Sequence, residues 1–200
     1  MSTVFIVDDD AGVRESLALL LRSAGLVPRT FGDGREFLAA AAPEGPACVL
    51  LDLKMPGMDG LEVQERMQAH GWTVPVIFLT GRADVPAVVR AIQRGAMDFL
   101  EKHHFDTGEL IRRVRDAIKQ HEEQLASEER EEGFRRGLSQ LSGRELEVAR
   151  LAAAGKANKV IGLELGISER TVEVHRGRAM RKLGLRTMAE LIRFYGRLAE

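Results

Sequence analysis

A regular alternation between short apolar runs and longer segments with helical spacing constrains this chain of 200 residues more than any other feature. The short runs are rich in β-branched and aromatic residues, as strands are, and they fall at 4–7, 27–30, 47–51, 74–79 and 98–101. The segments between them, at 13–24, 35–42, 61–70 and 85–94, with a fifth from Thr107, repeat apolar residues as a helix face does. Strands joined through helices run parallel, so we predict an α/β doubly wound five-stranded parallel sheet with helices on both faces.

The rest of the chain has no strand pattern. Glutamates and arginines dominate residues 121–137, which predicts a charged helical linker loosened at its end by Gly133 and Gly137; a dimerising coiled coil is the alternative. Beyond the linker we predict helices at 144–154, 158–165, 169–183 and 188–198. Their predicted N-caps are Ser142, with Glu145 in a capping box, Ser168 and Thr187. The expected domains are 1–120, which is α/β, and 138–200, which is smaller and all-α.

Charge is distributed unevenly between these two domains. Residues 1–125 carry 14 basic and 19 acidic side chains, whereas residues 138–200 carry 12 basic and 7 acidic ones, which suggests a polyanionic partner for the second domain. Cys48 is the only cysteine, so a disulfide framework and a cysteine metal site are excluded. Every apolar run is far shorter than the ~20 residues of a membrane span, and three aspartates fall within the first ten residues, so we expect a cytoplasmic protein without membrane contact.

Several reactive side chains directly follow the predicted strands. Asp8 and Asp9 follow the first strand, Asp52 the third, Thr80 the fourth and Lys102 the fifth. In a doubly wound sheet the carboxyl ends of the strands form the ligand-binding edge. Three ionised carboxylates there repel one another unless a hard cation and an ammonium offset them, and Mg²⁺ suits such ligands. With Mg²⁺ and Lys102 holding a phosphoryl donor, Asp52 can attack phosphorus as a carboxylate nucleophile, and Thr80 would bond a phosphoryl oxygen.

Four segments carry these residues, namely "FIVDDD", "LLDLKMPGMDG", "FLTG" and "AMDFLEK". In this order they resemble the receiver domains of two-component response regulators, over residues 3 to about 120. The resemblance implies a flavodoxin-like receiver in which Asp52 accepts a phosphoryl group from a sensor histidine kinase, and in which Thr80 and Phe99 switch together. It implies Mg²⁺ ligands at Asp8, Asp9, Asp52 and the backbone carbonyl of Lys54. Such a protein is a phosphoacceptor regulator rather than an enzyme, with at most self-phosphotransfer and autodephosphorylation at Asp52.

Two features leave alternatives open. The family usually has proline after the lysine, whereas His103 follows Lys102 here, so the loop need not contain a cis bond and the phosphorylation kinetics are open. Asp8 and Asp10 also have the spacing of the two acids in haloacid-dehalogenase-like phosphatases. That family expects Thr or Val where this chain has Gly12, and it expects a further acidic motif that we do not find. A charge at a helix N-terminus is the simpler interpretation of Asp10.

The segment "LSGRELEVARLAAAGKANKVIGLELGISERTVEVHRGRAMRKLGL" resembles the LuxR-type helix-turn-helix domains of NarL/FixJ regulators, over residues 138–198. On the predicted helix 169–183, Val172, Ala179 and Leu183 share one face and basic residues occupy another, which fits a helix placed in the major groove of DNA. The resemblance implies base contacts at Glu173, Val174 and Gly177. We expect phosphate contacts from the polar and basic residues Asn158, Lys159, Arg170, Thr171, Arg176, Arg178, Arg181 and Lys182.

The two resemblances together predict a phosphorylation-dependent transcriptional regulator. Its expected partners are a sensor histidine kinase and double-stranded DNA. We also expect a homodimer on phosphorylation, formed through the surface of the helix at 85–94 and the strand at 98–101.

Overall fold

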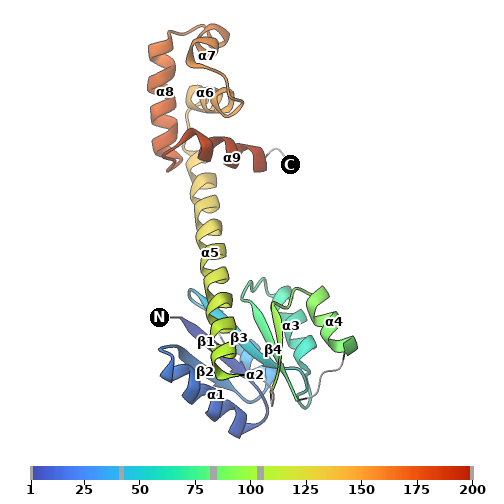
Figure 1. Ribbon diagram of the computed structural model, residues 1–200. Coiled ribbons are helices and arrows are strands. Elements are labelled where there is room, and N and C mark those ends of the chain that lie inside the picture. Colours follow the sequence, from blue (N-terminus) through green and yellow to red (C-terminus); the bar gives the residue numbers. More distant parts are fainter. Residues whose placement is uncertain (1, 41–42, 82–84, 103–105, 199–200) are drawn as a thin grey trace. The chain divides into compact units, whose positions relative to one another are not determined.

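The computed structural model describes residues 2–40, 43–81, 85–102 and 106–198, without the side chains of 85–88 and 197–198. The chain divides into two compact units, residues 1–125 and 126–200. Figure 1 shows a sheet flanked by helices in the first unit and helices in the second. Within the described residues, no helix combines the length and the apolar composition that crossing a bilayer requires.

The first unit contains a five-stranded sheet in which every paired neighbour is parallel. Its strands follow the order β2-β1-β3-β4-β5. The chain therefore adds β2 on one side of β1 and the later strands on the other side, so the strand order reverses between β1 and β3. This is the predicted doubly wound fold, and the strand at 98–101 has the predicted bounds. The strands are β1 (Thr3–Val7), β2 (Val27–Phe31), β3 (Ala47–Asp52), β4 (Val76–Thr80) and β5 (Asp98–Glu101).

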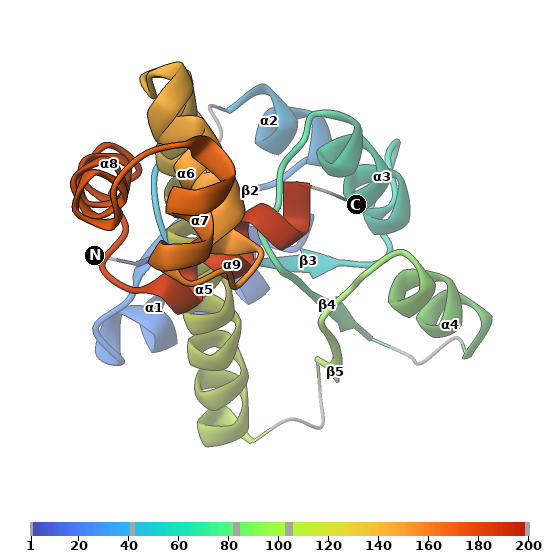
Figure 2. The ribbon, with the colours of Figure 1, turned by 90° about the horizontal axis from the view of Figure 1, so that it is seen from above.

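Helices cover both faces of this sheet (Figure 2). Helix α1 (Ala11–Ser23) and the first part of α5 (Thr107–Ser139) bury their apolar side chains against one face. Helices α2 (Gly34–Ala39), α3 (Gly60–Ala69) and α4 (Val85–Gln93) lie on the other. Because β3 and β4 are covered on both sides, all of their residues are buried, which explains their uninterrupted apolar sequence.

The second unit has α6 (Gly143–Ala153), α7 (Asn158–Leu165), α8 (Glu169–Lys182) and α9 (Met188–Leu198). The predicted caps are confirmed. Ser142 and Glu145 form a capping box at α6, and the Ser168 side chain accepts from the Thr171 N–H at α8. Thr187 caps the start of α9, where its hydroxyl accepts from the Glu190 N–H. Apolar side chains from all four helices meet in one core.

The end of α5 differs from the predicted loosened linker. The helix continues unbroken through Gly133 and Gly137 to Ser139. Phe134 is buried, and its ring stacks on Phe194 with centroids 4.9 Å apart. A Cβ atom at Gly137 would lie 2.5 Å from the Lys182 carbonyl oxygen, so the glycine permits close packing between the ends of α5 and α8. These long-range contacts stabilise the last turns of the helix and place them in the core of the second unit.

Candidate functional site

The carboxyl ends of four strands bring the predicted reactive side chains together at one edge of the sheet, a cluster that we call the carboxylate pocket. Asp8 follows β1, Asp52 and Thr80 are the last residues of β3 and β4, and Lys102 follows β5. The backbone N–H of Lys102 donates to the Thr80 carbonyl (2.8 Å), which extends the β4–β5 ladder by one residue. Asp8, Asp52 and Thr80 are buried, whereas Asp9 is exposed. The sheet itself therefore fixes the spacing of this site.

The Lys102 ammonium lies between two carboxylates, with Nζ 2.7 Å from Asp8 Oδ2 and 2.9 Å from Asp52 Oδ2. One carboxylate oxygen from each of Asp8, Asp9 and Asp52 lies within 4.8 Å of the others. Burial raises the pKa of Asp52, and the hydrogen bond and charge of Lys102 oppose this. Burial also disfavours the charged form of Lys102, but hydrogen bonds to Asp8 and Asp52 outweigh it and raise the pKa of the ammonium. Three carboxylates facing one ammonium suit a hard divalent cation.

Backbone groups hold the Asp52 side chain and main chain in place. The Lys54 N–H donates to Asp52 Oδ1 (3.3 Å). A Cβ atom at Gly60 would lie 2.3 Å from the Asp52 carbonyl oxygen and 3.1 Å from Leu53 Cα. Glycine at the first residue of α3 thus allows this helix to pack directly against the backbone of Asp52.

Asp10 has a structural position distinct from the pocket. Its Oδ1 accepts from the N–H groups of Gly12 (2.8 Å) and Val13 (3.2 Å), which caps α1. A position at the helix N-terminus is the interpretation of Asp10 that the sequence favoured over a phosphatase-like pair of acids at Asp8 and Asp10. Lys102 instead joins Asp8 to Asp52, which is the pairing expected for a receiver.

Arg14 contributes to the site but was not predicted. Its Nη1 donates to the Asp8 carbonyl (2.6 Å), and a Cβ atom at Gly32 would lie 3.4 Å from the same guanidinium. Arg14 therefore bonds the turn that carries Asp8 and lies beside Gly32, just after β2. An arginine on a helix usually faces water, so its spacing gave no signal of this contact.

Phe99 and Thr80 lie on neighbouring strands beside the pocket. The Phe99 ring stacks on Phe78 with centroids 5.3 Å apart and an interplanar angle of 24°. Phe78 is paired with Phe99 and Thr80 with Glu101 in the β4–β5 register, so the two predicted switch residues are two positions apart across the ladder. His103, which replaces the usual proline, lies outside the described residues.

In the second unit, α7 and α8 form a helix-turn-helix. Gly166 ends α7 with φ +66°, a left-handed conformation that glycine adopts without strain. A Cβ atom at Gly162 would lie 2.8 Å from the Ile167 carbonyl oxygen, so glycine allows the turn to fold tightly back on α7. Ser168 then caps α8. The two helices are thus joined by a short turn fixed at both ends.

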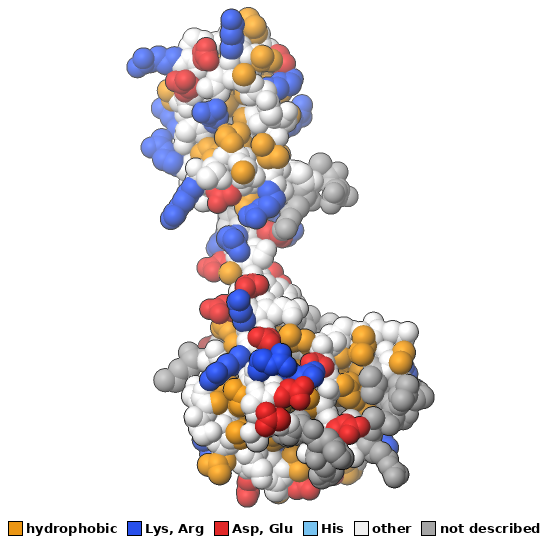
Figure 3. Space-filling model, viewed as in Figure 1, with side chains coloured by type: hydrophobic (Ala, Val, Ile, Leu, Met, Phe, Trp, Pro, Cys, Tyr) orange, Lys and Arg blue, Asp and Glu red, His pale blue; other side chains and the backbone are white. Residues whose placement is uncertain are grey.

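Helix α8 has one buried face and one exposed face, as predicted. Val172 and Ala179 are buried, as is Leu183 just after the helix. Lys and Arg side chains project along the edge of this unit that α8 occupies (Figure 3). The exposed members of the predicted DNA-contacting set are Lys159 on α7 and Arg170, Glu173, Val174, Gly177, Arg178, Arg181 and Lys182 on α8.

Some residues that we predict to contact DNA phosphates already bond other groups of the second unit. Arg176 Nη1 donates to Asn158 Oδ1 (3.0 Å), and Thr171 bonds the Ser168 cap. Lys182 Nζ lies 2.6 Å from buried Glu145 Oε2 and donates to the Gln140 carbonyl. The Lys182 hydrogen bond lowers the pKa of Glu145 to about 2. Lys182 therefore connects α8 to α6, a structural role that the sequence analysis did not identify.

Comparisons with known proteins agree with both units. The family model described as response regulator receiver domain matches residues 4–115, and that of bacterial regulatory proteins, luxR family, matches residues 139–195. The C4-dicarboxylate transport transcriptional regulatory protein DctR of Rhodobacter capsulatus is 42% identical over 193 residues, covering 96% of this chain and 98% of that protein. The transcriptional regulatory protein FixJ of Azorhizobium caulinodans is 41% identical over 190 residues, covering 95% and 90%.

A solved structure is similar over nearly the whole chain. The response regulator StyR is 40% identical and superposes with a TM-score of 0.80 over 98% of both chains. The family models span both units, and the relatives match nearly the whole chain. The chain therefore belongs to the response regulators of the NarL/FixJ type, phosphorylation-dependent transcriptional regulators that join a receiver domain to a LuxR-type DNA-binding domain.

Proposed function

We propose that Asp52 accepts a phosphoryl group from a sensor histidine kinase and that this modification controls dimerisation and DNA binding. The observation that carries the proposal is the Lys102 ammonium between Asp8 and Asp52, in a pocket of three carboxylates at the carboxyl ends of the strands. We place the receiver domain at 1–120 and the DNA-binding domain at 138–200, joined by the charged helical segment 121–137, whose Phe134 packs into the core of the second unit.

Asp8, Asp9, Asp52 and the Lys54 carbonyl would hold Mg²⁺ in this pocket. The donor set fits, because three carboxylates and one ammonium leave excess negative charge and supply the oxygen ligands that this ion prefers. When bound, Mg²⁺ supplies positive charge that offsets the carboxylates and the oxygens of a phosphoryl group.

The transfer itself uses the side chains of the pocket. A carboxylate oxygen of Asp52 attacks phosphorus as the bond from phosphorus to the kinase histidine nitrogen breaks, and that nitrogen keeps the electron pair. Lys102 stays protonated and pairs with a phosphoryl oxygen, while the Thr80 hydroxyl donates to another. The product is an acyl phosphate on Asp52, which later hydrolyses. The chemistry of the chain is at most this transfer and the hydrolysis of the acyl phosphate, in which water attacks phosphorus, inorganic phosphate leaves and the Asp52 carboxylate is restored.

The switch would then act through β5 and α4. Thr80 moves toward the phosphoryl group, Phe99 packs inward, and the surface of α4 and β5 becomes a dimer interface. Val89 and Ile92 support this, since they expose apolar side chains on α4. The dimer places two copies of α8 on paired half-sites of double-stranded DNA, where Glu173, Val174 and Gly177 meet base edges.

Sedimentation and DNA affinity, measured with and without a small phosphoryl donor, test this function. We expect the donor to convert monomers to dimers and to raise affinity for DNA selected from a random pool. Asp52→Asn should abolish both effects, whereas the matched variant Asp59→Asn, on the α3 cap, should retain them. A donor that changes neither association nor affinity would contradict the proposal.

A further inference from the structure

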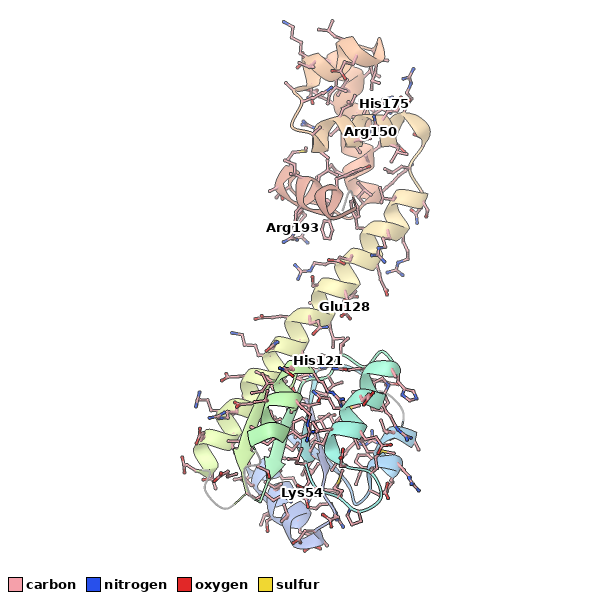
Figure 4. All side chains as sticks on the ribbon, turned by 90° about the vertical axis from the view of Figure 1, so that its right-hand side faces the viewer. Lys54, His121, Glu128, Arg150, His175 and Arg193 are labelled. Atoms are coloured by element: carbon pink, nitrogen blue, oxygen red, sulfur yellow. The ribbon has the colours of Figure 1, made fainter. Side chains whose placement is uncertain are left out.

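Arg14 bonds the backbone of the carboxylate pocket rather than its carboxylates. Its Nη1 donates to the Asp8 carbonyl (2.6 Å), while the Asp8 N–H donates to the Phe31 carbonyl at the end of β2 (3.2 Å). Asp8 is fully buried, and within the described ranges no backbone N–H bonds its carbonyl. A buried carbonyl without a donor costs free energy, so this oxygen depends on Arg14. The pocket lies at the end of the first unit that Lys54 marks in Figure 4.

The carbonyl that Arg14 bonds belongs to the peptide between Asp8 and Asp9. Because a peptide unit is planar, the direction of this carbonyl also fixes the nitrogen and Cα of Asp9. One oxygen of the exposed Asp9 carboxylate lies within 4.8 Å of one from each of Asp8 and Asp52. In the described part of the chain, the Asp9 side chain has no hydrogen-bond partner. Its placement therefore depends on its backbone.

The Asp8 carboxylate, in contrast, is held directly. Its Oδ1 accepts from the Asp10 N–H (3.0 Å), and its Oδ2 lies 2.7 Å from Lys102 Nζ. The loss of the Arg14 bond would therefore displace Asp9 more than Asp8.

The surroundings of Arg14 direct its guanidinium toward this carbonyl. Arg14 is half-buried, and no acidic side chain of the described residues forms an ion pair with it. A Cβ atom at Gly32 would lie 3.4 Å from Nη1, so this glycine leaves room for the guanidinium beside β2. A hydrogen bond from a charged donor is stronger than one between neutral groups, and arginine keeps its charge.

We propose that Arg14 is a positioning residue of the carboxylate pocket, which fixes the Asp8–Asp9 peptide and thereby holds the Asp9 carboxylate where it binds Mg²⁺. The inference rests on the proposed function, which requires this ion. Removal of a group that orients metal ligands typically lowers metal affinity roughly 10- to 100-fold. The charge of Arg14 acts with the opposite sign, because a guanidinium repels a cation and its loss alone would tighten Mg²⁺ binding. The direction of the change therefore separates positioning from charge.

Titration of the isotope-labelled full chain with Mg²⁺, followed by the amide resonances of Asp9 and Lys54, tests the proposal. Arg14→Met keeps an apolar stem but removes the donor, and we expect roughly tenfold weaker binding. The matched control Arg22→Met removes the same charge from an exposed position on α1 and should not weaken binding. Affinity in Arg14→Met that is unchanged or higher would overturn the proposal.

A conservative variant keeps the test decisive if Arg14→Met does not fold. Arg14→Lys retains the charge on a shorter side chain without the planar donor group, so we expect it to weaken Mg²⁺ binding less than Arg14→Met does. If only Arg14→Lys folds, an affinity equal to that of the unsubstituted chain would overturn the proposal.

Phosphorylation by a small donor gives a second readout. The substitution leaves Asp52, Thr80 and Lys102 in place, so Arg14→Met should react slowly at low Mg²⁺ and recover at saturating Mg²⁺. A deficit that persists at saturation would indicate general distortion of the pocket and overturn the proposal. If the unsubstituted chain itself bound no Mg²⁺, the proposed function would fail together with this inference, whereas normal binding by Arg14→Met would contradict this inference alone.

Discussion

We predict opposite effects on stability when glycine is replaced by alanine at two positions one turn apart on α5, Gly133 and Gly137. A Cβ atom at Gly137 would lie 2.5 Å from the Lys182 carbonyl oxygen and 2.8 Å from Leu183 Cα, whereas one at Gly133 would meet nothing within 4 Å. The atoms that obstruct residue 137 belong to the backbone, so they cannot move aside as a flexible side chain does. Gly137→Ala must therefore shift α5 or the end of α8.

The magnitudes follow from helix propensity and overpacking. Gly133→Ala should stabilise the second unit by about 0.5–1 kcal/mol, because alanine is the better helix former. Gly137→Ala gains the same amount from helix propensity but loses about 1–3 kcal/mol to overpacking, so we expect a net destabilisation of up to about 2.5 kcal/mol. Hydrogen exchange at α8 amides measures both changes, with Trp72 fluorescence reporting the first unit. Equal protection in the two variants would refute the packing of α5 against α8.

Three further predictions concern the two sites. Lys102→Met removes the hydrogen bond and charge that oppose the raised pKa of Asp52, so we expect this pKa to rise further and phosphorylation by a small donor to slow by roughly 100-fold; an unchanged rate would contradict the assigned role. Arg178→Ala should weaken binding to every DNA sequence and reduce the salt dependence, whereas Glu173→Ala should mainly change sequence preference, and equal effects on both would argue against this division. The pKa of Glu145 falls from about 4.5 to about 2 in the folded state, so the ionised side chain stabilises the fold fully above pH 4.5, and this stabilisation is lost as the pH falls to about 2. Acid unfolding of Glu145→Gln should lack this pH dependence, and an acid transition that is the same in both proteins would count against the Lys182–Glu145 pair.

Local signals in the sequence were sufficient for the order of the elements and for the carboxylate pocket. Strands buried on both faces have uninterrupted apolar sequences. The cap residues Ser142 and Ser168 accept hydrogen bonds from N–H groups only three residues further along the chain. Asp8, Asp52 and Lys102 could be placed together because a parallel sheet brings the carboxyl ends of its strands to one edge.

The features that the sequence did not predict depend on contacts between distant segments. Phe134 lies in a charged segment, yet it is buried in the core of the second unit, where its ring stacks on Phe194. Arg14 and Lys182 have the pattern of solvated helix residues, yet each bonds a group on another element. Side-chain spacing along one helix does not indicate such partners.

Chemical trapping of the phosphorylated residue tests the central claim most directly. The full chain would be treated with a small phosphoryl donor and Mg²⁺, the acyl phosphate reduced with borohydride, and the altered residue located by peptide mass spectrometry. We expect the modification at Asp52, in the peptide that also contains Lys54. A modification at Asp8, or none under conditions in which the chain is folded, would contradict the account of this pocket.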